Sequence, residues 1–164
     1  MDRRDKQNYY LDIAETVLER GTCLRRNYGS IIVKNDEIIS TGYTGAPRGR
    51  KNCIDLNSCI REKLQVPRGT QYELCRSVHS EANAIISAPR KDMIGAILYL
   101  VGKDVKTKEY VMDANSCSMC KRLIINAGIS YVIIRVSKEE HREINVDSWI
   151  EDDDSLRIMK DAGY

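Results

Sequence analysis

The stretch CRSVHSEANAIISA, residues 75–88, joins a histidine to the start of an Ala- and Ile-rich segment. His79 is one of two histidines in the 164-residue chain, and Glu81 follows it with a single residue between them. The run that follows predicts a helix that begins directly after His79. The stretch therefore places two chemically versatile side chains, those of His79 and Glu81, at the N-terminus of one predicted helix.

Helices and strands alternate on both sides of this stretch. Apolar residues at helical spacing predict a helix over residues 9–20. The segment 31–43 is typical of a hairpin that turns at Asn35 and Asp36. Further predicted elements are a strand at 96–101, a polar excursion at 102–110, a helix at 117–127, a strand at 131–136, and a short C-terminal helix after the acidic run 151–154. Strands alternating with helices predict a layered α/β sheet.

The composition fits one domain over residues 1–164, long enough to bury a core without disulfides. Charged residues make up 30% of the chain and the net charge is +2, which is too balanced for nonspecific nucleic-acid binding. No apolar run approaches the roughly 20 residues of a membrane span. The charged N-terminus lacks an apolar segment behind it, so no secretory signal is expected. These features predict a cytoplasmic protein with neither a membrane nor a nucleic acid as partner.

Six cysteines are the unusual feature of the composition. Without an export signal, a reducing compartment favours metal-binding or catalytic thiols over disulfides. Buried free cysteine is the alternative for any one of them. Residues 45–76 hold three of the six together with Gly, Pro and Arg, and they show little periodicity. A loop of this length is uncommon in a compact domain unless something ties it down.

The stretch SCSMC, residues 116–120, places Cys117 and Cys120 at the start of the predicted helix. Both thiolates can then point the same way, and a helix N-terminus favours their ionised forms. Taken alone, such a pair is either a redox pair or half of a structural zinc site. If both helix starts face one cleft, His79, Cys117 and Cys120 supply three ligands and leave a fourth position open, as in catalytic zinc sites.

Glu81 completes this hypothesis. Zinc with an open position lowers the pKa of its bound water toward about 7. A nearby carboxylate that is not a ligand can then carry protons. The sequence therefore predicts His79 as a metal ligand and Glu81 as the catalytic proton carrier.

Together, HSE at 79–81 and SCSMC resemble the H-x-E…P-C-x-x-C signature of the zinc-dependent cytidine deaminase superfamily. Residues 22–49, CRSVHSEANAII and INAGISYVII resemble its deoxycytidylate (dCMP) deaminase branch, and the similarity covers about residues 10–136. The resemblance implies a three-layer α/β/α fold around a mixed five-stranded sheet. The residues beyond it, 137–164, are expected to form a C-terminal helical extension. It also implies hydrolysis of dCMP to dUMP and ammonia in a homo-oligomer, often a hexamer, that dCTP activates and dTTP inhibits.

Three positions depart from the pattern of this branch. Ser80 replaces the usual alanine between histidine and glutamate, and Ser116 replaces the usual proline before the first cysteine. Thr44 replaces the asparagine of a G-Y-N-G-x-P-x-G loop that helps to bind the effector, so it bears on regulation. The segment 102–115 is also longer than usual and bears on substrate choice, because it borders the rim of the active site.

Four cysteines remain after the catalytic set: Cys23, Cys53, Cys59 and Cys75. Four is the number that a closed tetrahedral zinc site needs. Some dCMP deaminases carry a second zinc, and Cys23, Cys53 and Cys75 match cysteine positions in such members, with Cys59 the fourth by elimination. The resemblance thus implies two zinc ions per chain, one catalytic and one structural. Four unrelated buried thiols are the alternative.

Three further residues are predicted to bind the nucleotide. Arg25 and Arg26 lie in a segment that is near the nucleotide in relatives, and they are candidates to pair with its phosphate. The alternative is that Arg25 and Arg26 are ordinary surface arginines without a ligand. Asn83 matches an asparagine of relatives, and a helix-surface or capping role is its alternative. His141 lies in a polar stretch and is predicted to be solvated.

Two rival functions stay open. One is deamination of another nucleoside, a free base, a pterin-like ring or a base in RNA, although the absence of a basic stripe argues against RNA. The other is a non-enzymatic, zinc-stabilised binding module. Glu81 argues against such a module, because a purely structural zinc site has no use for an acid beside its ligand.

Overall fold

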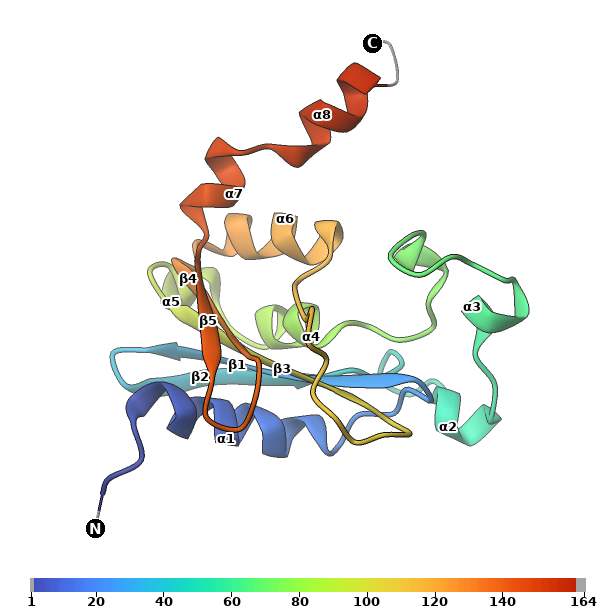
Figure 1. Cartoon of the computed structure of the whole chain (residues 1–164), viewed down its shortest axis with the longest axis horizontal. Helices are drawn as coiled ribbons and strands as arrows, with labels where there is room; N and C mark the ends of the chain where they lie inside the picture. Colours follow the sequence, from blue (N-terminus) through green and yellow to red (C-terminus); the bar gives the residue numbers. More distant parts are fainter. Residues whose placement is uncertain (1, 162–164) are drawn as a thin grey trace.

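The computed structural model describes residues 2–161. Five strands form one mixed sheet in the order β2-β1-β3-β4-β5 (Figure 1). They are β1 Arg26–Lys34, β2 Glu37–Tyr43, β3 Ile97–Asp104, β4 Tyr131–Arg135 and β5 His141–Asn145. Strands β3 and β4 run parallel, and the other neighbouring pairs run antiparallel. The mixed five-stranded sheet is confirmed.

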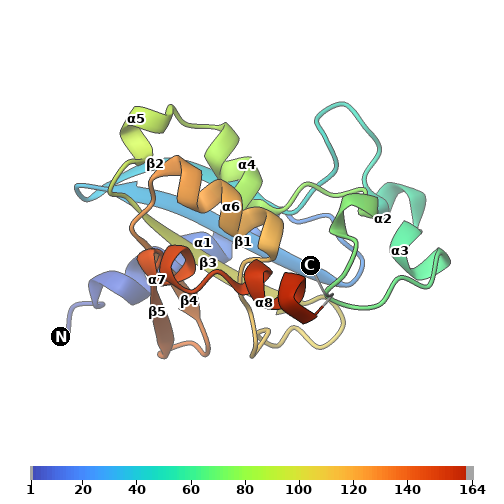
Figure 2. The same ribbon diagram turned by 90° about the horizontal axis from the view of Figure 1, so that it is seen from above.

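Helices cover both faces of this sheet. They are α1 Lys6–Leu18, α2 Cys53–Leu56, α3 Ile60–Lys63, α4 Ser80–Ile86, α5 Arg90–Met93, α6 Ser118–Ala127, α7 Asp147–Glu151 and α8 Asp154–Asp161, with the 3-10 helix η1 at Tyr72–Leu74. Helix α1 packs on one face, and α4, α5 and α6 lie over the other (Figures 1 and 2). The three-layer α/β/α arrangement is therefore confirmed.

Each face of the sheet carries its own apolar core. Alternate residues of a strand point to opposite faces, so Ile31 of β1 packs with α1 whereas Ile32 packs with α4. Both side chains are fully buried. Complete burial of such a side chain contributes roughly 1.5–3 kcal/mol. The two clusters together hold the helices against the central strands β1 and β3.

Two glycines let the helices rest directly on the strand backbone. A Cβ atom at Gly29 would lie 2.2 Å from the carbonyl oxygen of Ala14 in α1. At Gly42, a Cβ atom would lie 2.3 Å from the carbonyl oxygen of Ser80 in α4. A larger residue at Gly42 would push away helix α4, which begins directly after His79.

The predicted elements are present, with shifted ends. Helix α1 begins earlier than predicted because Asp5 caps it, its side chain accepting a 3.0 Å hydrogen bond from the backbone N–H of Asn8. Strand β3 continues to Asp104, where it pairs with Arg26 of β1. Part of the predicted polar excursion is therefore strand. Polar side chains are accommodated there because this end of the sheet is less buried.

The C-terminal extension needs a correction. Residues 137–164 were expected to be helical, and residues 162–164 lie outside the described part of the chain. The described segment first forms β5, which pairs antiparallel with β4. Strand β5 is at the edge of the sheet and mostly exposed, so its sequence HREIN lacks the apolar alternation that marks a half-buried strand. His141 lies in β5 and is half-buried rather than solvated. Helices α7 and α8 follow.

None of the helices within residues 2–161 has both the length and the apolar character that crossing a membrane requires.

Candidate active site

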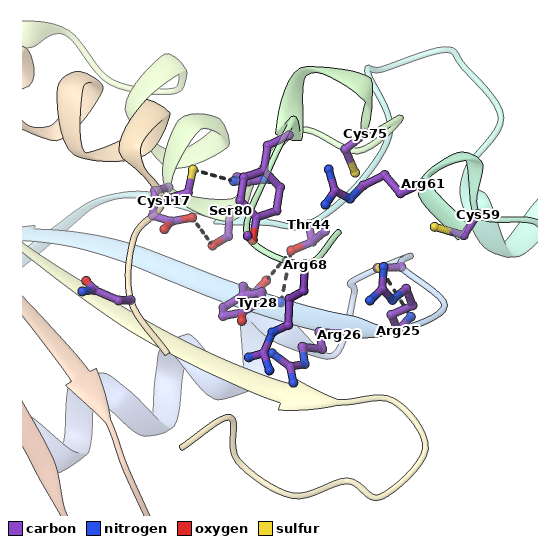
Figure 3. A pocket seen from close by; sticks show the side chains of 16 residues that line it. Arg25, Arg26, Tyr28, Thr44, Cys59, Arg61, Arg68, Cys75, Ser80 and Cys117 are labelled. Carbon is purple, nitrogen blue, oxygen red and sulfur yellow. Dashed lines mark hydrogen bonds between the residues drawn. The ribbon is translucent and has the colours of Figure 1, made fainter. Parts of the chain in front are cut away.

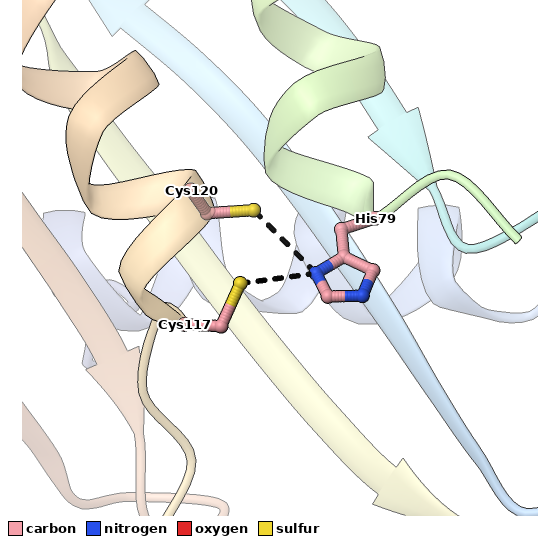
Figure 4. A group of neighbouring side chains, drawn as sticks. All are labelled: His79, Cys117 and Cys120. Carbon is pink, nitrogen blue, oxygen red and sulfur yellow. Dashed lines mark hydrogen bonds between the residues drawn. The ribbon is translucent and has the colours of Figure 1, made fainter. Parts of the chain in front are cut away.

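The two predicted helix starts meet at one point. His79 is the N-cap residue of α4 and Cys117 is the N-cap residue of α6. The Nδ1 atom of His79 lies 3.4 Å from the Sγ atom of Cys117 and 3.5 Å from the Sγ atom of Cys120 (Figure 4). The structure thus brings together the three ligands predicted for the catalytic zinc.

The geometry of this cluster fits zinc. Tetrahedral zinc with bonds of about 2.05 Å to nitrogen and about 2.3 Å to sulfur separates these two atoms by about 3.5 Å. The observed distances of 3.4 and 3.5 Å agree with this value. Imidazole and thiolate are also the donor types that zinc prefers. Because three ligand side chains are present, a fourth coordination position would stay open to water.

Electrostatics favour a thiolate in the cluster. A hydrogen bond with the Cys120 thiol, with further help from the His79 ring, lowers the pKa of Cys117 despite its burial. The hydrogen bond with Cys117 and burial raise the pKa of Cys120. A second thiolate beside the first would place two negative charges close together, which is unfavourable. The contact with Cys117 raises the pKa of His79. A bound cation would offset the charge of both thiolates.

Glu81 lies beside this cluster in the first turn of α4. Its side chain is nearly buried, with the residue 4% exposed. One carboxylate oxygen, Oε1, accepts a 3.0 Å hydrogen bond from the Ser116 hydroxyl. The other, Oε2, accepts a 3.1 Å hydrogen bond from the Ser80 hydroxyl. Glu81 also lines the same pocket as His79 and Cys117.

Tyrosines and one asparagine form further walls of this pocket (Figure 3). Tyr28 comes from β1, Tyr72 from η1, and Asn115 from the segment before α6. The Tyr72 ring packs edge-on against the His79 ring, with 5.1 Å between the ring centroids. In the segment 102–115, which was expected to border the rim of the site, Tyr110 does not line the pocket and donates a 2.8 Å hydrogen bond to Glu15 in α1.

The end of the pocket away from Cys117 is basic. Arg25, Arg26 and Arg68 gather there (Figure 3). Arg25 makes a 3.4 Å ion pair with Glu62, and Arg68 donates to both carboxylate oxygens of Asp113 at 3.1 Å. The structure therefore places the two arginines predicted to bind phosphate in the same pocket as Glu81.

Arg68, Tyr28 and Tyr72 are pocket residues that the sequence analysis missed. Arg68 lies in the unperiodic segment 45–76, where no spacing indicates which side chain faces the pocket. The arginine content of that segment was the one feature of the sequence that could have pointed to a further phosphate ligand there.

Arg61 holds the segment 45–76 in shape. It is buried, and it donates hydrogen bonds to the carbonyl oxygens of Thr70, Gln71 and Pro67 at 2.6, 2.7 and 3.1 Å. Its guanidinium lies 4.6 Å from the centroid of the Tyr72 ring. Arg61 thus ties the loop down from within and supports the tyrosine that contacts His79.

The four remaining cysteines lie in one region without forming a ligand set. Cys23, Cys59 and Cys75 line the pocket, and Cys53 is buried close enough to interact electrostatically with all three. Burial raises the pKa of Cys53 and of Cys75. Within residues 2–161, no three of the four bring their sulfur atoms within 4.8 Å of one another. The second zinc therefore stays a prediction.

Asn83 and Thr44 hold the backbone around the site. The Asn83 side chain donates to the carbonyl oxygens of Tyr43 at 2.8 Å and Val78 at 3.4 Å, so it ties the end of β2 to α4. It does not line the pocket, and its role in substrate binding stays a prediction. The Thr44 hydroxyl accepts a 3.1 Å hydrogen bond from the backbone N–H of Tyr28. Both side chains therefore fasten the segment that carries His79 and the strand that carries Tyr28.

The fold and this site define a class of protein. Three potential zinc ligands at two helix N-termini and a buried carboxylate outside that set, on a three-layer α/β/α sheet, are the features of zinc-dependent deaminases. The family model described as the cytidine and deoxycytidylate deaminase zinc-binding region matches residues 4–136. The chain belongs to this family.

Individual relatives agree with that assignment. The deoxycytidylate deaminase of Mycobacterium phage D29 is 36% identical over 138 residues, which cover 81% of this chain and 96% of the phage protein. The deoxycytidylate deaminase of Schizosaccharomyces pombe is 30% identical over 143 residues, 86% of this chain but 38% of the yeast protein. A crystal structure of the dCMP deaminase from cyanophage S-TIM5 with dCMP and dUMP has a TM-score of 0.54 at 21% identity, covering 82% of this chain and 84% of that one. The structural likeness shows the shared fold.

Proposed function

We propose that this chain hydrolyses dCMP to dUMP and ammonia. The observation that carries the proposal is Glu81, buried beside the His79–Cys117–Cys120 cluster and outside the ligand set, in one pocket with the arginines of its basic end. The phage relative, 36% identical over 138 residues, is a deoxycytidylate deaminase. Deamination replaces the amino group of the cytosine ring with an oxygen atom from water. The reaction therefore needs an activated water and a group that moves protons.

The residues around the cluster divide these tasks. A zinc ion held by His79, Cys117 and Cys120 would supply, when bound, the activated water. Glu81 takes up the two protons of the attacking water in turn and delivers one to the ring nitrogen and the other to the leaving amine. Because Glu81 is buried, bulk water does not compete for these protons.

The pocket walls support a nucleotide as substrate. Tyr28 and Tyr72 offer flat surfaces to a pyrimidine ring. Arg25, Arg26 and Arg68 offer a positively charged end for a 5′-phosphate, and guanidinium groups bind phosphate in a bidentate manner. Engagement of Arg68 would compete with its contact to Asp113, which is exposed and therefore weak.

The proposal extends to a second, structural zinc held by Cys23, Cys53, Cys59 and Cys75. Its support is the gathering of these thiols around one pocket. The family resemblance further favours a homo-oligomer with dCTP and dTTP as effectors, and the composition favours the cytoplasm as its location. Light scattering with and without these nucleotides tests the assembly.

A substrate panel tests the proposed reaction. Ammonia release is measured for dCMP, CMP, deoxycytidine, cytosine and dCTP with the zinc-loaded protein. The expected result is the highest kcat/KM for dCMP. A preference for deoxycytidine or cytosine, which lack phosphate, would refute the dCMP assignment.

A further inference from the structure

The carboxylate of Glu81 is held by two hydroxyls that come from different elements. Ser80 is the first residue of α4, and Ser116 precedes the N-cap of α6. Their hydrogen bonds, 3.1 and 3.0 Å long, end on different oxygens of the carboxylate. All three residues are buried. Ser80 and Ser116 are also the two positions near the metal cluster where this chain departs from the alanine and proline of its family's pattern.

The direction of the hydrogen bonds follows from the number of protons. A serine hydroxyl has one proton to donate. The Ser80 hydroxyl lies 2.7 Å from the hydroxyl of Ser30 in β1. Because Ser80 donates its proton to Glu81, it must accept the proton of Ser30. A chain of hydroxyls therefore runs from the centre of the sheet to the carboxylate.

These contacts fix the orientation of Glu81 without filling its capacity. An ionised carboxylate has about four acceptor positions, two on each oxygen. The serines occupy one position on each oxygen, so one on each is left for the reacting groups. Rotation of the carboxylate would break both contacts inside a buried site, where unmade hydrogen bonds are costly.

We propose that Ser80 and Ser116 are positioning residues for Glu81, with Ser30 orienting Ser80. The inference rests on the proposed role of Glu81 as proton carrier. The serines hold the carboxylate in the one orientation from which it reaches both water and substrate. Their loss leaves the pocket intact but lets Glu81 adopt unproductive orientations, so it lowers kcat more than it raises KM.

The test compares Ser80→Ala, Ser116→Ala and Ser116→Thr. Each alanine variant is expected to lower kcat for dCMP about tenfold, the effect of one hydrogen bond to a charged group. The expected change in KM is less than about twofold, with zinc content unchanged. Ser116→Thr keeps the hydroxyl and should restore kcat. Ser40→Ala is the matched control. Ser40 of β2 is buried, and its hydroxyl donates a 2.7 Å hydrogen bond to the carbonyl oxygen of Ala84 in α4, the helix that carries Ser80 and Glu81.

Two results would overturn the inference. One is an unchanged kcat in both alanine variants that retain zinc. The other is an equal loss in Ser40→Ala, which would assign the effect to a weakened helix α4. A readout without substrate is thermal unfolding of the metal-free protein, in which Ser116→Ala should cost less in a Glu81→Ala background than in the wild type. Additive effects there would also overturn the inference.

The same variants separate this inference from the proposed function. Serine variants without effect, alongside an inactive Glu81→Gln variant, refute only the positioning role. A Glu81→Gln variant that keeps its turnover refutes the proposed function.

Discussion

At the scale of single residues, the proposed chemistry is divided between groups that would bind metal and one group that would move protons. His79, Cys117 and Cys120 come from helix starts, where the backbone directs their side chains to one point. Glu81 lies beside them but is held by serine hydroxyls instead of joining the cluster. This division predicts that the two kinds of residue respond differently to substitution.

Glu81→Gln is expected to keep the fold and the zinc but to lose turnover by about 10²–10⁴-fold, because an amide cannot carry the proton. His79→Ala is the matched comparison and should lose zinc together with activity. Zinc analysis and ammonia release on both variants check the difference. Near-normal turnover in Glu81→Gln would contradict the assigned role.

Arg25→Ala, Arg26→Ala and Arg68→Ala are expected to raise KM for dCMP by roughly ten- to a hundredfold, the worth of a charge-assisted contact of about 1.5–3 kcal/mol. Activity on deoxycytidine should change little, since it lacks the phosphate. Arg20→Ala serves as the control, because Arg20 is exposed and does not line the pocket. Equal losses on both substrates would indicate that an arginine supports the structure rather than the phosphate.

At the scale of elements, the site depends on how closely α4 approaches the sheet and on how α1 is held to the opposite face. The approach of α4 is set by Gly42. The position of α1 is set by Arg135 of β4, which is fully buried and pairs with Asp12 at 2.8 Å and Glu15 at 2.6 Å. Both features join elements that are distant in the sequence.

Gly42→Ala should destabilise the protein by about 1–3 kcal/mol or more, because its new Cβ atom meets backbone that cannot move aside freely. Displacement of α4 should also weaken zinc binding through His79. Gly45→Ala is the matched control, since a Cβ atom there meets nothing closer than 3.4 Å. Denaturant unfolding and zinc titration of both variants measure the two effects. Equal unfolding free energies and zinc affinities of the two variants would show that the close approach of α4 at Gly42 is not what stabilises the site.

The ion pairs of Arg135 predict a loss of stability in acid. Although burial opposes the effect, hydrogen bonds from Arg4, Lys138 and Arg135 lower the pKa of Asp12. For Glu15, hydrogen bonds from Lys103, Tyr110 and Arg135 likewise outweigh burial and lower the pKa. Carboxylates with a lowered folded-state pKa contribute stability that is present above their unfolded pKa of about 4 and is lost as the pH falls through the folded value.

Unfolding free energies measured from pH 7 downward should therefore decline below about pH 4. The decline should be shallower in Asp12→Asn and Glu15→Gln, which remove the titrating groups. Glu37→Gln, at an exposed position of β2, is the control for the removal of one carboxylate. A slope identical in all variants would contradict the assignment.

At the scale of the whole molecule, the cysteines divide between the catalytic cluster and the region around residues 45–76. Metal analysis of the pure protein is expected to return two zinc ions per chain. Cys53→Ser should remove one zinc and lower the unfolding temperature while the catalytic zinc stays, because closed zinc sites contribute folding energy directly. Cys117→Ser should remove the other zinc and abolish turnover. A single zinc per wild-type chain would eliminate the structural site.

Local patterns in the sequence determined most of the sheet, its helices and the metal cluster. Helical spacing and strand runs are short-range signals, so α1, the β1–β2 hairpin, β3, α6 and β4 were predictable. His79, Cys117 and Cys120 were predictable as ligands as well, because each lies at a helix start that its neighbours in the sequence define. That the two helix starts meet was an assumption, which the structure bears out.

Only the tertiary structure decided β5, the place of Arg68 and the partners of Glu81. Strand β5 exists because β4 offers it an unpaired edge, a feature absent from the sequence of β5 itself. Arg68 and Glu81 line the same pocket. They belong to different segments, and no spacing in the sequence indicates that these segments meet. Ser116 reaches the Glu81 carboxylate from 35 residues away, at 3.0 Å. Such contacts depend on how α4 and α6 pack over β1 and β3, and packing is a property of the whole chain.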